Sequence, residues 1–316
     1  MNLFFGSVNI PVGTVIDILC GHSGTDVEKF IILQSRLPMA ITALLAGAGL
    51  ASTGLMLQTA FRNPLAGPSV LGINSGASLG VALVMLLAGG SISAGSTSLD
   101  GYAAVIAGAF VGSMFIMGIL ILLSTILKST LMLLITGIMI GYLASSVIML
   151  LNYAATAEGV HSYVLWGMSS FGGVTMNDMP MFASLNAIGI FISLLLVKPL
   201  DIMMLGDRYA ANLGLNLNRL RNLLLLATGL LTAVITAFCG PVSFIGLSVP
   251  HISRLIFRTD LHRKLLPATL LTGSVVALMC NLICILPENS VMPLNAVTPL
   301  IGAPVVIWVL VSRRSK

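Results

Sequence analysis

Long apolar stretches separated by short polar segments run along most of this chain. No charged residue occurs between Arg62 and Asp100, nor between Asp100 and Lys128. Each gap exceeds the roughly 20 apolar residues that a helix needs to cross the hydrocarbon core of a membrane. The pattern predicts an all-α transmembrane bundle, formed as a single domain over residues 1–316. Nine complete spans are expected, at approximately 38–60, 69–90, 102–127, 131–154, 180–199, 222–239, 243–257, 265–286 and 294–311.

The first 36 residues do not read as a signal peptide. They lack the positively charged amino-terminal region of a signal peptide, and Gly6, Pro11 and Gly13 interrupt their apolar segments. We expect the end of a span followed by an extramembrane segment, with the first complete helix starting after it.

The basic residues indicate how the spans are oriented. With the carboxyl terminus in the cytoplasm, Lys29 and Arg36 are the only Lys and Arg residues that fall outside. This asymmetry follows the rule that positive residues stay on the cytoplasmic side. Nine spans then place the amino terminus outside, which requires a preceding span. We therefore expect that a first helix is missing or truncated here and that the full protein has ten.

A polar insertion, LGDRYAANLGLNLNRLRN, separates two very apolar stretches in the carboxyl-terminal half. Asp207 can cap the start of a short helix, Gly214 favours its end, and a second helix can begin near Asn216. The pattern predicts two short helices at the membrane surface, in a cytoplasmic loop covering about 201–221, where another protein could contact them. An ordinary loop is the alternative.

An external segment at about 155–179 is too polar and too rich in glycine to form a full span. Its apolar core, from Tyr163 to Trp166, predicts a short re-entrant or interfacial helix. Trp166 would then lie at the membrane interface, where tryptophan is enriched.

Composition agrees with a membrane protein and excludes several functions. The chain is 57% hydrophobic and only 8% charged, with a mean hydropathy of +1.05. The net charge of +5 does not indicate nucleic-acid binding, because the basic residues are spread over short loops. The four cysteines lack the spacing of a metal site, so no bound metal is expected.

Catalytic motifs are missing from the sequence. It contains no phosphate-binding GxxxxGK[ST] loop, so ATP hydrolysis would need a separate subunit. No carboxylate lies in the middle of a predicted span, which disfavours an ion-coupled carrier. An ATP-independent carrier or channel remains the alternative, and a membrane-anchored enzyme is a third reading for which no polar cluster is found.

Glycine and proline mark two further stretches. Gly72, Gly76 and Gly80 recur every four residues and predict a smooth face for close helix packing. Within 239–257, Gly240-Pro241 ends one helix and Pro250 breaks or kinks the next.

Four longer motifs stand out along the chain. They are SRLPMAITALLAGAGLASTGLMLQTAFRNPLAGPSVLGINSGASLG at 35–80, LGDRYAANLGL at 205–215, GPVSFIGLSVPHISRL at 240–255 and NAVTPLIGAPVVIWVL at 295–310. Together they resemble the membrane permeases of the iron–siderophore, haem and cobalamin ABC importers, the FecCD-type family, in that family's order and spacing. The resemblance extends over nearly the whole chain.

The resemblance implies a ten-helix subunit that pairs with a second copy, usually as a homodimer. It also implies two cytoplasmic ATPase subunits and a periplasmic or lipid-anchored substrate-binding protein as partners. ATP and magnesium belong to the ATPase, and the permease itself needs no cofactor. The bacterial inner membrane is the expected location, with a ferric siderophore or a similar chelate as substrate. Haem and cobalamin are possible substrates, and FGGVTM at 171–176 leans towards cobalamin.

The resemblance also assigns roles to individual residues. The turn with Asn63 and Leu65 and the turn with Ser129 and Thr130 resemble the family's cytoplasmic gates. Arg36 matches a residue that docks the binding protein, although Met39 replaces the next basic position. An arginine that snorkels to the outer interface is the alternative. The residues expected to couple to the ATPase are Leu205, Gly206, Asp207, Arg208, Ala210, Leu213 and Gly214.

Overall fold

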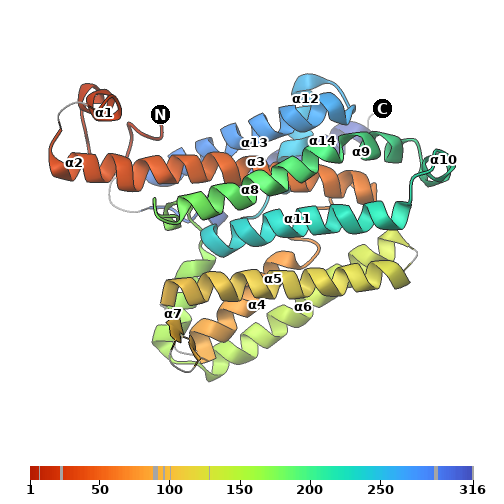
Figure 1. The fold of residues 1–316 in the computed structure, drawn as a ribbon, viewed down its shortest axis with the longest axis horizontal. Helices are drawn as coiled ribbons and strands as arrows, with labels where there is room; N and C mark the ends of the chain where they lie inside the picture. The colour runs from red at the N-terminus through yellow and green to blue at the C-terminus, as the bar shows by residue number, and fades with distance from the viewer. Residues whose placement is uncertain are drawn as a thin grey trace.

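The structure is a computed structural model, and it consists almost entirely of helices packed side by side (Figure 1). Within the described residues, β1 (Ile92–Ala94) and β2 (Thr97–Leu99) form a short antiparallel strand pair. The structure describes residues 1–6, 8–21, 24–87, 92–94, 97–99, 101–127, 129–287 and 291–314.

Each of the nine stretches predicted to span the membrane contains a helix. These helices are α3 (Leu37–Phe61), α4 (Ile73–Ala82) with η2 (Leu83–Leu87), α5 (Gly101–Ile126), α6 (Thr130–Ala154), α8 (Met179–Leu195), α11 (Leu217–Cys239), α12 (Ile245–Phe257), α13 (His262–Ile285) and α14 (Leu294–Arg314). The all-α membrane bundle is therefore confirmed.

The number of spans is less simple than the number of helices. Among the described residues, five helices are long and apolar enough to cross a membrane, or six if α8 and α9 (Val197–Met204), bent by 45°, count as one. Three other apolar helices are shorter, namely the α4–η2 pair, α12 and α14. The count of nine complete spans stays a prediction.

The helix that contains α3 starts earlier than the sequence predicts. It runs from Asp26 to Phe61 over 36 residues, through α2 (Asp26–Phe30) and the wider turns of η1 (Ile31–Arg36). Thr25 and Glu28 form a capping box at its start, in which each side chain accepts a hydrogen bond from the other residue's backbone N–H. This local signal sets the start, so 26–36 is helical and continuous with α3, whereas the sequence predicted that the helix begins near residue 38.

Two further short helices lie near the amino terminus and between α6 and α8. They are α1 (Val12–Leu19), near the amino terminus, and α7 (Ala157–Gly167), with the single-turn η3 (Phe171–Gly173) following it. The helix predicted around Tyr163–Trp166 is thus present as α7, in the segment between α6 and α8.

Glycines let the helices approach closely in several places. A Cβ atom on Gly80 would overlap the carbonyl oxygen of Gly108, and one on Gly112 would overlap that of Gly76. Gly76 and Gly80 therefore form the predicted close contact with α5, whereas Gly72, just before α4, lies against Gly137 of α6. On the other side of the molecule, a Cβ atom on Gly54 of α3 would overlap the carbonyl oxygen of Gly246 in α12.

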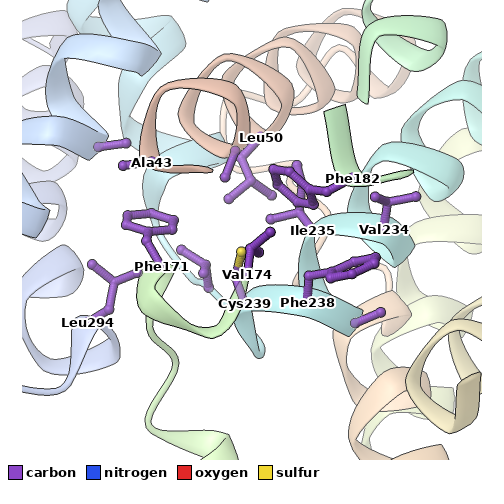
Figure 2. Close-up of a cluster of buried hydrophobic side chains, with 14 of the residues drawn as sticks. Ala43, Leu50, Phe171, Val174, Phe182, Val234, Ile235, Phe238, Cys239 and Leu294 are labelled. Atoms are coloured by element: carbon purple, nitrogen blue, oxygen red, sulfur yellow. The ribbon is translucent and has the colours of Figure 1, made fainter. Parts of the chain in front are cut away.

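A continuous hydrophobic cluster fills the middle of the bundle (Figure 2). Leu50 of α3, Phe182 of α8 and Ile235 of α11 meet there. Phe182 packs edge-on against Phe238, with ring centroids 5.5 Å apart, an arrangement that aromatic pairs favour. The cluster holds α3, α8 and α11 together, and their ends carry the candidate functional segments.

Candidate functional site

The polar insertion forms a compact turn of helix between α9 and α11. The six-residue helix α10 (Asp207–Asn212) begins after Gly206, whose φ is 112°, and the chain leaves it through Gly214 at φ 85°. Glycine adopts such positive φ values without steric cost. Gly206 rather than Asp207 occupies the cap position, and the Asp207 side chain lies outside what the structure describes.

The second helix of the insertion begins where the sequence predicts. Asn216 caps α11, and its side-chain oxygen accepts a 3.0 Å hydrogen bond from the backbone N–H of Arg219. The helix then continues without interruption into the apolar stretch, so it is the start of α11 rather than a separate element.

Large apolar side chains are exposed on this insertion. Tyr209 is 68% exposed and Leu213 is 64% exposed, and Met204 and Leu205 are at least half exposed. Ala210, in contrast, is fully buried and anchors α10 to the rest of the molecule. We call Met204, Leu205, Tyr209 and Leu213 the coupling patch, after the role that the resemblance implies for this loop. A cluster of exposed apolar side chains in a polar loop is typical of a protein-binding surface.

The turn after α3 is held by its own asparagine. Asn63 Oδ1 accepts a 2.9 Å hydrogen bond from the backbone N–H of Leu65, and the Asn63 carbonyl accepts one of 3.0 Å from Ala66. Asparagine stabilises turns in this way. The Leu65 side chain is 42% exposed and projects from the turn.

The second predicted gate lies at the start of α6. Ser129 caps this helix by accepting a hydrogen bond from the backbone N–H of Met132, and Thr130 Oγ1 accepts one of 3.3 Å from the Arg221 guanidinium. Lys128, before it, lies outside the described residues. Figure 1 shows that α3 and α5 end, and α6 and α11 begin, at the end of the molecule that carries α10.

A polar cavity of about 280 Å³ lies between the Asn63 turn and the end of α9, which leads into α10. Arg254 borders it, with its guanidinium 2.7 Å from Gln58 Oε1 and 3.4 Å from Asp260 Oδ1. The residues lining the cavity are Gln58, Thr59, Arg62, Asn63, Pro64, Met204, Arg254 and Asp260.

Arg36 is buried at the end of η1, directly before α3. Its guanidinium donates hydrogen bonds to the carbonyl oxygens of Leu3, at 2.9 Å, and Phe4, at 3.2 Å, and also to that of Val8. The buried side chain therefore holds the amino-terminal segment against η1. Docking of a binding protein by Arg36 stays a prediction.

The model of the FecCD transport family matches residues 1–312, almost the entire chain. The chain belongs to the FecCD transport family. Its relatives include the vitamin B12 import system permease protein BtuC of Salmonella typhi, 36% identical over 283 residues, which are 89% of this chain and 84% of BtuC. BtuC of Citrobacter koseri is 36% identical over 287 residues, covering 90% and 84% of the two chains.

Solved structures agree with this membership. An inward-facing structure of a metal-chelate type ABC transporter matches the FecCD chain with a TM-score of 0.82 and 31% identity, over 92% of this chain and 90% of that one. PsaBC of Streptococcus pneumoniae matches at a TM-score of 0.55 with 16% identity, over 93% and 94% of the chains, and shows the fold alone. This FecCD protein is a permease of an ABC importer, and its family consists of transport proteins rather than enzymes.

The histidines of this FecCD permease were not singled out by its sequence. They are scattered along the chain, but folding brings two of them to the carboxyl-terminal end of α3. His251 Nε2 lies 2.9 Å from the Pro64 carbonyl oxygen, and His262 Nε2 lies 2.8 Å from Thr59 Oγ1. A run of polar residues at the end of the otherwise apolar α3 was the signal that could have identified this cluster.

Replacing Arg36 by methionine is expected to loosen the amino-terminal segment of the FecCD permease. The change removes the donors to three carbonyl oxygens, and each lost partner of a buried polar group costs about 1–3 kcal/mol. Amide hydrogen exchange at Phe4 and Phe5, whose N–H groups bond to Met1, should accelerate at least about tenfold. Arg263→Met, an exposed change at the other end, is the control. Unchanged exchange together with weakened binding-protein affinity would instead favour docking.

Proposed function

We propose that this chain is the membrane subunit of an ATP-driven importer that takes up a metal chelate. The coupling patch supports the proposal most directly, because it provides an exposed apolar surface where the family places its ATPase contact. The cytoplasm would then lie on the side of α10, and the carboxyl terminus would be cytoplasmic, in the bacterial inner membrane.

The complete importer would contain two copies of this permease, two ATPase subunits and a substrate-binding protein. ATP and magnesium would bind to the ATPase subunits. Closure of these subunits around ATP would move the coupling loops and open the path between the permease copies to one side of the membrane at a time. Membership of the FecCD family and the ABC transporters among its relatives support this assembly.

Within the coupling loop, we assign different tasks to the residues. Leu205 and Leu213 provide exposed apolar contact, and Asp207 and Arg208 provide charge at the start of α10. The tasks of the remaining three are conformational or structural. Gly206 and Gly214 give the loop its sharp ends, and buried Ala210 fixes the helix to the bundle.

The two turns at the same end would close the path. Leu65 offers an apolar side chain, and Asn63, Ser129 and Thr130 offer uncharged polar groups. Such a constriction can close by packing and hydrogen bonding between uncharged side chains. Asn63 lines the cavity, and the start of α6 lies at the end of the molecule that carries α10, which supports this role.

Cobalamin is the first substrate to test. The relatives named above are vitamin B12 permeases at 36% identity, and the structural relative is of metal-chelate type. Ferric siderophores and haem belong to the same chemical class, large chelates of a transition metal, and remain in the comparison.

The test is ATP hydrolysis by the purified permease–ATPase complex in lipid bilayers. Binding protein loaded with cobalamin, ferric siderophore or haem is added in turn, and empty binding protein is the control. We expect one loaded protein to stimulate hydrolysis at least about threefold and to deliver its chelate into the vesicle. If the permease associates with no ATPase, the importer is excluded and an ATP-independent carrier or channel takes its place.

A further inference from the structure

Three helices are joined by a chain of polar contacts at the coupling end. Thr59 Oγ1 of α3 lies 2.8 Å from Nε2 of His262, the first residue of α13. His262 Nδ1 lies 2.8 Å from Oδ1 of Asp201 in α9, and the same oxygen accepts a 2.7 Å hydrogen bond from the His262 backbone N–H. We call these contacts the Thr59–His262–Asp201 bridge.

Burial makes this bridge a fixed feature rather than a surface contact. The His262 side chain is 1% exposed, and Thr59 is also buried. Buried polar groups need hydrogen-bonding partners because they have lost those of water. The Asp201 carboxylate accepts from both the ring and the backbone of His262, which orients the imidazole so that Nε2 faces Thr59. It also provides the negative charge that the start of α13 favours, since Leu261 offers no side-chain cap.

The bridge connects the two segments to which the proposed function assigns gating and coupling. Thr59 lies four residues before Asn63, in the last turn of α3. Asp201 belongs to α9, the helix that leads directly into α10. A second contact runs in parallel, because the Arg62 guanidinium donates a 3.2 Å hydrogen bond to the carbonyl oxygen of Met203.

Apolar packing is interrupted in the same place. The 280 Å³ cavity is bordered by Thr59 and Asn63 on one side and by Met204 on the other. Side chains therefore do not fill the space between the Asn63 turn and the end of α9. Polar contacts beside the cavity connect these segments, and the open space allows them to move.

We propose that Thr59, His262 and Asp201 are positioning residues that transmit movement of the coupling loop to the Asn63 turn. The inference rests on the proposed function, since it needs an ATPase that moves the loop. When α9 shifts, the bridge draws the end of α3 with it, so the gate follows ATP closure. Without the bridge, ATP hydrolysis continues but moves the gate less effectively.

The test measures how many chelate molecules enter a vesicle for each ATP hydrolysed, using radiolabelled cobalamin and its loaded binding protein, or the chelate that stimulates the wild type. Thr59→Val keeps the size and branching of the side chain but removes the hydroxyl. We expect this ratio to fall about tenfold, because a buried histidine nitrogen loses its partner. Thr59→Ser keeps the hydroxyl and should remain within about twofold of the wild type.

A purely structural role predicts a different result. It would lower the amount of folded complex, or its melting temperature, and leave the ratio unchanged in the molecules that remain. A wild-type ratio in Thr59→Val would therefore overturn the inference. If Thr59→Val does not assemble, the same measurement on Asp201→Asn decides, because this isosteric change weakens the other half of the bridge. A wild-type complex without ATP-driven uptake of any chelate would overturn the proposed function, and the inference with it.

Discussion

Replacing Gly54 by alanine is expected to prevent the FecCD permease from folding stably. A Cβ atom at this position would overlap the carbonyl oxygen and carbonyl carbon of Gly246. Backbone atoms cannot rotate away as the end of a side chain can, so α3 and α12 would have to separate. Overpacking in a core usually costs about 1–3 kcal/mol, and here we expect at least about 3 kcal/mol.

The measurement is the yield and melting temperature of the purified permease in detergent. Gly118→Ala is the matched control, because Gly118 also lies within a long helix but has no atom within 4 Å of its added Cβ. Alanine favours helix over glycine by about 1 kcal/mol, so the control should be unchanged or slightly stabilised. Equal behaviour of the two variants would contradict the close contact between α3 and α12.

A glutamate in place of Leu213 is expected to abolish productive contact with the ATPase. Leu213 is one of the most exposed members of the coupling patch, so the change should not disturb the permease itself. In the complex, however, it would remove apolar contact and bury an unpaired charge. We expect the ATPase to bind at least about 100-fold more weakly, which corresponds to about 2.7 kcal/mol.

Binding is measured by titrating the ATPase onto permease reconstituted in nanodiscs. Val27→Glu is the control, because Val27 is 69% exposed and lies in α2, at the end of the molecule away from α10 (Figure 1). The melting temperature of both variants should equal that of the wild type. If Val27→Glu weakens ATPase binding as much as Leu213→Glu does, α10 is not the docking surface.

The helices of this protein were largely predictable because the membrane imposes a simple pattern. A stretch of apolar residues without charges forms a helix, since all its backbone groups must bond internally. The glycine face on α4 was predictable for a similar reason, because its repeat lies within one short segment. The start of the long helix at Asp26 was missed, since the Thr25–Glu28 capping box overrides the polar character of the residues after it.

The candidate site was predictable only where it is local in sequence. The loop with α10 and the Asn63 turn depend on neighbouring residues, so glycine and asparagine signals located them. The partnership of Thr59 with His262 joins residues 203 positions apart. The packing of the whole bundle decides which helix ends meet. Contacts between residues so far apart cannot be predicted from local patterns in one sequence.

The helix from Asp26 to Phe61 also has a mechanical consequence. At 1.5 Å per residue, its 36 residues extend about 54 Å, well beyond the roughly 30 Å hydrocarbon layer. Arg36, in its amino-terminal third, holds the amino-terminal segment, and its carboxyl-terminal end carries Thr59 and leads into the Asn63 turn. When a helix of this length tilts by about 5° about one end, its other end moves by about 5 Å. A force on the amino-terminal segment and a force on the Asn63 turn would therefore act on separate parts of one continuous helix.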